Sequence, residues 1–129
     1  MSLDPKAVHT DAAPAAIGPY SQAVTSAGLT FVSGQLGGDP TTGVIPEDFA
    51  EQVRQALTNL KTIVEAAGSD MTRVVSVDAF LLDMGNFQAF HGIYAEFFKD
   101  HLPARVVMAV AALPREAQVE VRCVAAQKG

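Results

Sequence analysis

Two ionisable side chains, Arg105 and Glu120, stand inside otherwise apolar stretches near the C-terminal end of the sequence. Arg105 begins an apolar run, where a permanently charged guanidinium needs a carboxylate or phosphate partner from the protein or from a ligand. Glu120 interrupts the last apolar run, where poor solvation would raise the pKa of a carboxylate and let it exchange protons near neutrality. These residue types predict an anion-binding group and an acid/base group.

A purely structural role is the commoner explanation for such residues. Arg105 could form a salt bridge or reach solvent from a strand end, and Glu120 could face outward and pair with Arg122. If the last two strands formed a simple hairpin, Ala109 would oppose Glu120, and Arg105 would lie about 13 Å along the sheet. Spacing alone therefore does not assemble a site from these two residues.

Three further side chains are weaker candidates for binding a ligand. Tyr20 and Ser33 flank the first two predicted strands and can form hydrogen bonds, although Tyr and Ser near turns are ordinarily structural. His91 can titrate near neutral pH, although a helical histidine is more often a surface or packing residue. The sequence has no nucleophile elbow, phosphate loop or zinc-binding spacing, so no metal site is expected.

Length and composition narrow the class of protein. A chain of 129 residues with 49% hydrophobic and 18% charged residues is expected to form a single domain over residues 1–129. The net charge of −5 and the absence of a basic cluster interleaved with aromatic residues argue against nucleic-acid binding. The apolar runs are shorter than a membrane helix needs, and the chain does not begin like a secretory signal, so a cytoplasmic protein is expected.

Apolar spacing predicts two helices. From Asp48, apolar residues recur at intervals of three and four, with Asp48 and Glu51 as a capping box and Gly68 as a stop. Asp83 is expected to cap a second helix, which Pro103 ends. The second helix carries an aromatic stripe that predicts core packing rather than a cofactor pocket, formed by Phe87, Phe90, Tyr94, Phe97 and Phe98.

Five strands are predicted from β-branched and apolar runs, at residues 22–26, 29–33, 73–82, 105–111 and 118–126. Ala27-Gly28 fits a tight hairpin turn, and the glycine-rich residues 34–43 form a loop. The order ββαβαββ indicates an α+β fold with a mixed sheet and both helices on one face. Because the other face would expose apolar residues such as Val106, we expect it to be covered by oligomerisation.

The sequence also resembles the RidA (YjgF/L-PSP) family in several motifs that follow one another in the family's order. Residues 13–23, APAAIGPYSQA, look like the family's opening, and FVSGQ follows at residues 31–35. The similarity continues through VEAAG, YAEFF, PAR, LP and VEV, at residues 64–68, 94–98, 103–105, 113–114 and 119–121. It covers nearly the whole chain.

This resemblance implies a chorismate-mutase-like fold and a homotrimer with a central barrel, with ligand clefts between subunits. It implies that Arg105 binds the carboxylate of an amino-acid-derived enamine or imine, that Glu120 activates a water, and that Tyr20 and Ser33 line the pocket. The products would be a 2-oxo acid and ammonia, as for a 2-iminobutanoate/2-iminopropanoate deaminase. No cofactor is required, because the imine carbon is already electrophilic.

Departures from the family pattern leave the substrate open. Val107 stands where deaminating members usually carry a cysteine, although backbone groups there could still bind substrate, and His91 stands where many members have an asparagine. Residues 99–102 also form a shorter segment than in typical members. Two alternatives remain: an endoribonuclease, as the L-PSP name implies, which an acidic chain supports weakly, and a non-catalytic carboxylate-binding or chaperone-like trimer.

Overall fold

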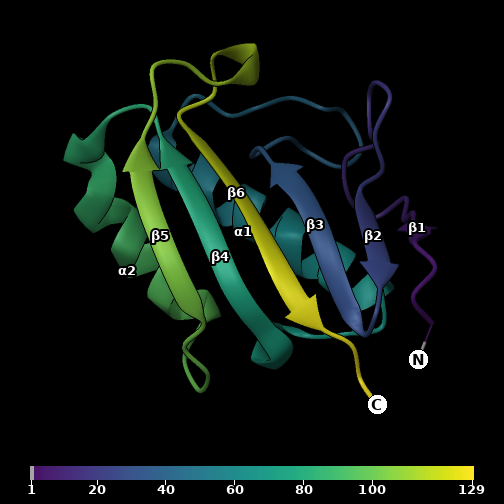
Figure 1. The fold of residues 1–129 in the computed structure, drawn as a ribbon. Helices are drawn as coiled ribbons and strands as arrows, with labels where there is room; N and C mark the ends of the chain where they lie inside the picture. Colours follow the sequence, from purple (N-terminus) through teal and green to yellow (C-terminus); the bar gives the residue numbers. More distant parts are fainter. Residues whose placement is uncertain (1) are drawn as a thin grey trace.

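A computed structural model describes residues 2–129 and contains one mixed sheet with two long helices (Figure 1). The sheet has the strand order β1-β2-β3-β6-β4-β5, and only the β4–β5 pair is parallel. Neither helix is long and apolar enough to cross a membrane within the described residues. The elements are β1 (Lys6–Val8), β2 (Ala23–Ser26), β3 (Leu29–Gln35), α1 (Phe49–Ala66), β4 (Val74–Leu81), α2 (Phe87–Phe97), β5 (Ala104–Ala109) and β6 (Val119–Ala126).

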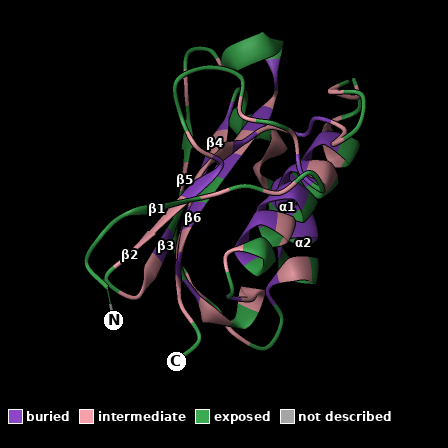
Figure 2. Ribbon diagram, turned by 90° about the vertical axis from the view of Figure 1, so that its right-hand side faces the viewer, coloured by how far each residue is buried: buried purple, intermediate pink, exposed green. Residues whose placement is uncertain are grey.

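Both helices pack on the same face of the sheet, as the sequence predicted (Figure 2). Side chains alternate along β6, and along β4 from Val77 onward, so that every second residue there is buried against the helices. Leu57 and Leu60 of α1 meet Val77 and Val121 in this core, and all four are at most 1% exposed. The opposite face leaves large apolar side chains exposed, namely Phe31, Val75, Val106 and Met108. The predicted α+β fold with one uncovered sheet face is confirmed.

Helix α1 begins and ends at the residues that the sequence indicates. The Asp48 side chain accepts a hydrogen bond from the backbone N–H of Glu51 at 3.0 Å, which satisfies one unpaired donor of the first turn. Gly68 follows the helix with a φ of +87°, and its N–H donates to the Glu65 carbonyl at 3.0 Å. This left-handed backbone favours glycine, so the chain leaves the helix there.

Two elements differ from the prediction. Strand β1 was not predicted, because its three residues are too few to give a strand signal and are held in place by pairing with β2. The order of elements is therefore βββαβαββ. The second helix is also shorter than predicted, because Asp83 caps a separate 3-10 turn at Met84–Asn86 and α2 runs only from Phe87 to Phe97. Residues 98–103 form a connection rather than a continuation of the helix up to Pro103.

The simple hairpin considered for the last two strands does not form, because β4 lies between β5 and β6. Val77 of β4 pairs with Arg105 on one side and with Cys123 on the other, while Glu120 pairs with Phe80. Helix α2 carries the chain from β4 to the parallel strand β5, and such a crossover places the new strand beside the old one. The following connection then returns past β4 to β6. Ala109 therefore does not oppose Glu120.

Buried amides attach the loop between β3 and α1 to the helix. Asn59 is fully buried on α1, and its Nδ2 donates to the carbonyls of Leu36 at 3.1 Å and Gly38 at 2.9 Å. Two turns nearer the helix start, Gln52 Nε2 donates to the Pro46 carbonyl at 2.8 Å. Carbonyls taken out of water need such donors. The two side chains therefore determine the course of the loop along α1.

Replacing Asn59 with alanine should lower the free energy of unfolding by about 2–4 kcal/mol, because two inward-facing loop carbonyls lose their donors. Gln55→Ala is the matched control, since Gln55 is half-buried and only donates to the Asn59 side chain; it should cost less than about 1 kcal/mol. Urea unfolding at one fixed protein concentration measures both values. Equal losses would mean that other contacts hold the loop.

Candidate functional site

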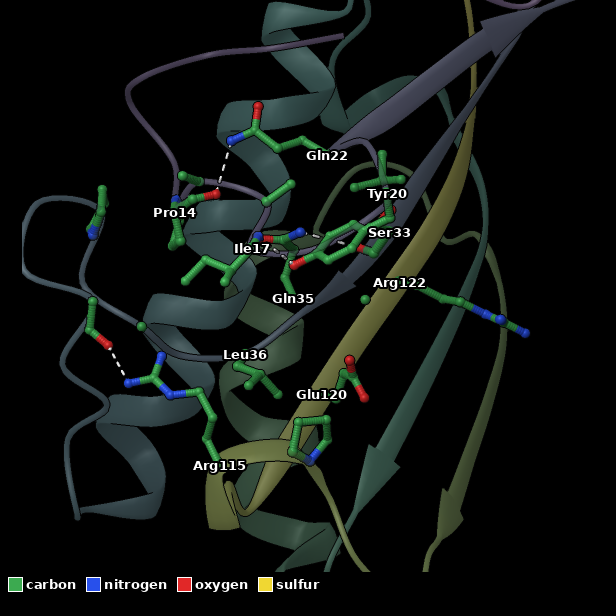
Figure 3. A pocket seen from close by; sticks show the side chains of 18 of the residues that line it. Pro14, Ile17, Tyr20, Gln22, Ser33, Gln35, Leu36, Arg115, Glu120 and Arg122 are labelled. Carbon is green, nitrogen blue, oxygen red and sulfur yellow. Dashed lines mark hydrogen bonds between the residues drawn. The ribbon is translucent and has the colours of Figure 1, made fainter. Parts of the chain in front are cut away.

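A cavity of about 1220 Å³ opens beside Glu120 (Figure 3). Strands β2, β3 and β6 form its floor, and three loops form its walls, at residues 14–20, 36–43 and 114–115. The predicted candidates Tyr20, Ser33 and Glu120 all line it. The structure thus brings together three of the six candidate site residues, from parts of the chain that are far apart in sequence.

Glu120 points away from the helix-covered core, because its neighbours Val119 and Val121 take the buried positions of β6. Its carboxylate is half-buried, and this burial raises its pKa above the ordinary value of 4.5, against a smaller opposing effect of Arg122. Arg122 instead forms an ion pair with Asp78, with 2.8 Å between Nε and Oδ2. The possible Glu120–Arg122 pair is not formed, and Glu120 has no ion pair within residues 2–129.

Strand β3 makes room for the Glu120 carboxylate at Gly34. A Cβ at Gly34 would overlap the end of the Glu120 side chain, so glycine allows the carboxylate to keep the position that it has here. The pairing of β3 with β6 also shifts register between Val32 and Gln35, and such an irregularity re-aims the residues within it. Ser33 lies in this irregular stretch, and its Oγ donates to the Ser21 carbonyl at 2.6 Å.

The loop before β2 carries Tyr20 along the edge of the cavity. Gln22 is buried at the base of this loop, and its Nε2 donates to the Pro14 carbonyl at 2.9 Å. At the loop tip, the Ile17 N–H donates to the Tyr20 hydroxyl at 3.3 Å. Tyr20 remains 53% exposed. The ring and hydroxyl of Tyr20 are therefore available to a ligand at the cavity mouth (Figure 3).

Arg105 lies elsewhere, on the outer strand β5, with its guanidinium against α2. Its Nη1 is 3.3 Å from Nδ1 of His91, and because a guanidinium can only donate, His91 accepts there. Its Cζ lies 4.8 Å from the ring centre of Tyr94 and 5.8 Å from that of Phe87. Arg105 forms no ion pair within residues 2–129, so its charge is not neutralised by the described part of the chain. Val107 is half-buried against the same core.

The six candidate residues therefore form two groups on opposite faces of one sheet. Arg105, which lies in register with the buried Val77, belongs with His91 and Val107 on the helix side. Glu120, in register with the less buried Phe80, faces the other side. Residues that follow each other along a strand alternate between faces, so the registers of β5 and β6 on β4 separate the two charges. A single chain therefore does not bring the charges of Arg105 and Glu120 together.

Arg115 also lines the cavity, although the sequence analysis did not identify it as a candidate. Arg115 lies at the mouth of the cavity, where its Nη2 donates to the Gly43 carbonyl at 2.8 Å (Figure 3). Arg115 and Glu116 both have a φ of +56°, a left-handed backbone that costs free energy for residues with side chains. No spacing signal marks Arg115, because its approach to the cavity depends on the turn after Pro114.

The arrangement offers two complementary chemical groups. Glu120 is a half-buried carboxylate that has no charged partner in the described part of the chain, and it can accept a proton from a bound water. Arg105 is a cation that has no carboxylate partner among the same residues, and it can bind an anion through two parallel hydrogen bonds. Together they are the two kinds of group that a site for a small carboxylate reacting with water requires.

Comparisons with known proteins agree with this fold. The family model described as Endoribonuclease L-PSP matches residues 10–127. The 2-iminobutanoate/2-iminopropanoate deaminase of Bos taurus is 45% identical over 127 residues, which cover 98% of this chain and 93% of the relative. Two crystal structures from E. coli each have a TM-score of 0.91 and cover 95% of this chain and 99% of their own: the YjgF gene product, 40% identical, and TdcF with bound serine, 36% identical. The chain therefore belongs to the endoribonuclease L-PSP family, which is also known as the RidA or YjgF family.

Proposed function

We propose that this protein hydrolyses 2-imino acids and their enamine tautomers to 2-oxo acids and ammonia. Relatives that are 42–45% identical over nearly the full chain carry the name 2-iminobutanoate/2-iminopropanoate deaminase. The observation that carries the proposal is the pair of charged side chains Arg105 and Glu120, on β5 and β6, neither of which forms an ion pair within residues 2–129. A cation for a carboxylate and a base for a water are the two groups that imine hydrolysis needs.

The proposed active site is shared between subunits of a homotrimer, each subunit being one domain. Within one chain, Arg105 and Glu120 face opposite sides of the sheet, so a second copy has to supply the missing group. The open sheet face supports assembly, because Phe31, Val106 and Met108 are each between 41% and 47% exposed there. A closed ring of three copies would bury this face and bring Arg105 of one subunit to the Glu120 cavity of the next.

Arg105 would orient the substrate. Two of its N–H groups would bind the substrate carboxylate in parallel, while Nη1 keeps its contact with His91. This places the neighbouring imine carbon at a fixed distance from the cavity floor, which converts an encounter in solution into a positioned reaction. His91 and Val107 would flank the bound substrate. The serine bound to the related TdcF is an amino acid with the same carboxylate group, which supports this binding mode.

Glu120 would then move the protons of the reaction. Its carboxylate accepts a hydrogen bond from water and takes a proton as the water oxygen bonds to the imine carbon, while the C=N electron pair moves to nitrogen. The proton passes from Glu120 to this nitrogen and gives a carbinolamine. Glu120 then takes the proton of the new hydroxyl group and donates it to the amino nitrogen, so that the C–N bond breaks and ammonia leaves as the carbonyl forms. One imine and one water thus become one 2-oxo acid and one ammonia, without a cofactor. Tyr20 and Ser33 would line the pocket around the reacting carbon.

Arg105→Ala should reduce kcat/KM for freshly generated 2-iminobutyrate by about 100-fold or more, because the carboxylate loses two charge-assisted hydrogen bonds. Glu120→Gln should reduce kcat by about 100-fold or more, because an amide cannot take the proton from water. Ammonia and 2-oxo acid release measure both effects. Arg54→Ala is the control, since Arg54 pairs with Glu96 on the helix surface and should leave activity unchanged. Equal, slow hydrolysis by wild type and Arg105→Ala would instead favour carboxylate binding without turnover.

Mixing the two inactive variants should restore activity if the site is shared. In randomly mixed trimers, a site works when its first subunit retains Arg105 and its neighbour retains Glu120, so about one quarter of wild-type activity should return. Co-expression of differently tagged Arg105→Ala and Glu120→Gln chains provides the mixed trimers, and native mass spectrometry verifies their composition. Absence of any recovery in verified mixed trimers would place the site within a single chain.

The pH dependence of the catalysed rate should reflect the ionisation of the Glu120 carboxylate. Water activation needs the ionised carboxylate, and burial holds the pKa of Glu120 above its ordinary value of 4.5. The catalysed rate should therefore fall as the pH is lowered through this raised pKa, and level off at higher pH. The rate of the uncatalysed reaction in the same buffer is subtracted at each pH. The residual activity of Glu120→Gln should lack this acidic limb, and an unchanged limb in the variant would assign it to another group.

A further inference from the structure

Helix α2 surrounds the guanidinium of Arg105 with aromatic side chains. Phe87, His91 and Tyr94 are spaced four and three residues apart, which places them on one face of the helix. Arg105 Cζ lies 4.8 Å from the centre of the Tyr94 ring and 5.8 Å from that of Phe87, both within the range of a cation–π interaction. The rings of Phe87 and His91 are also stacked, with centres 5.8 Å apart.

The Tyr94 ring is the rigid part of this surface. It is 6% exposed and lies in the middle of an aromatic column, 5.6 Å from the Phe90 ring and 4.6 Å from the Phe98 ring. Phe90 and Phe98 are buried themselves. A ring held on both sides by buried rings has no free rotamer to adopt, because the core is close-packed. Tyr94 therefore presents an immobile face to Arg105.

An aromatic face suits an arginine that must bind a ligand. A carboxylate on α2 would have held Arg105 more strongly, but it would have occupied the N–H donors and neutralised the charge. A ring attracts the cation through its face and leaves the N–H groups in the guanidinium plane free. Arg105 is thus held in place while most of its donors remain available.

The Tyr94 hydroxyl does not explain why tyrosine occupies this position. It is buried without a hydrogen-bond partner within residues 2–129, which costs free energy rather than stabilising the fold. Burial raises the pKa of Tyr94 to about 12, so the hydroxyl stays neutral at physiological pH and does not pair ionically with Arg105. The contact that matters is the ring face.

We propose that Tyr94 is a positioning residue, whose ring holds the Arg105 guanidinium in the orientation that binds the substrate carboxylate. This inference rests on the proposed function in taking the substrate to be a 2-imino acid. It goes beyond that function by assigning a role in substrate affinity to a residue of the aromatic stripe that otherwise belongs to the core.

Three variants separate positioning from packing. Tyr94→Phe keeps the ring and removes the unpartnered hydroxyl, whereas Tyr94→Leu removes the ring face. Phe98→Leu is the matched control, because Phe98 is buried in the same column but has no cation–π contact with Arg105. If Tyr94→Leu does not fold, Tyr94→Met, which keeps more of the side-chain volume, replaces it. Thermal unfolding shows how far each substitution disturbs the core.

Two measurements test whether Arg105 is correctly positioned. The first is KM and kcat for 2-iminobutyrate, and the second is the Kd of the unreactive carboxylate 2-oxobutyrate, measured by calorimetry. Tyr94→Leu should raise both KM and Kd by about 5- to 20-fold, with kcat changed less than about 3-fold, because a cation–π contact is lost. Tyr94→Phe should stay within about 2-fold of wild type in both constants and melt no lower. Phe98→Leu should melt at a lower temperature but bind 2-oxobutyrate like wild type.

Other outcomes would overturn the inference. If Phe98→Leu weakens 2-oxobutyrate binding as much as Tyr94→Leu, or if Tyr94→Phe is as impaired as Tyr94→Leu, the residue acts through packing or through its hydroxyl. The Kd of 2-oxobutyrate also tests this inference independently of the proposed reaction. If the wild type binds 2-oxobutyrate through Arg105 without hydrolysing imines, the proposed function fails and the positioning role is still decided by the variants. If Arg105→Ala leaves the Kd unchanged, the positioning role fails as well.

Discussion

The pairing of β4 with a strand on each side is the constraint on which the candidate site depends. Antiparallel β6 and parallel β5 both take their register from β4, and the register decides which residues face the helices. A shift of one residue in either pairing would turn Arg105 or Glu120 to the other face. The burial of Val119 and Val121 opposes such a shift of β6, because each displaced valine would lose about 1.5–3 kcal/mol of burial. Core packing thus maintains the placement of Glu120, whereas β5 has only the half-buried Val107 against the core.

The two arginines that meet aromatic rings in this sheet differ in a way that bears on function. Arg122 lies 5.7 Å from the Phe80 ring centre and also pairs with Asp78, so its charge is compensated within the chain. Arg105 has rings and a neutral imidazole contact, but no carboxylate within residues 2–129. An uncompensated guanidinium is the group that gains most from an anionic ligand. The contrast supports Arg105 rather than Arg122 as the substrate-binding arginine.

Two residues, Val107 and His91, depart from the usual family pattern, but both charged groups of the proposed mechanism are retained. At Val107 the cysteine usual in deaminating members is absent, and the valine side chain is half-buried against the core. His91 still contacts Arg105 and accepts a hydrogen bond from it. The cation and the carboxylate of the proposed mechanism are both present. In the proposed mechanism, these two positions would therefore bear on which imino acid fits, while Arg105 and Glu120 would bear on whether hydrolysis occurs.

Local signals in the sequence were enough to locate both helices, five of the strands, the cap at Asp48 and the stop at Gly68, because each depends on neighbouring residues. Motif resemblance was enough to name the family and its candidate residues. The opposite orientation of Arg105 and Glu120 and the steric role of Gly34 came only from the tertiary structure. They depend on which distant strands pair and in which register, and no short stretch of sequence records that. The physical reason is the parallel crossover through α2, which places β5 beside β4 at the edge of the sheet, so that β4 separates β5 from β6, the next strand along the chain.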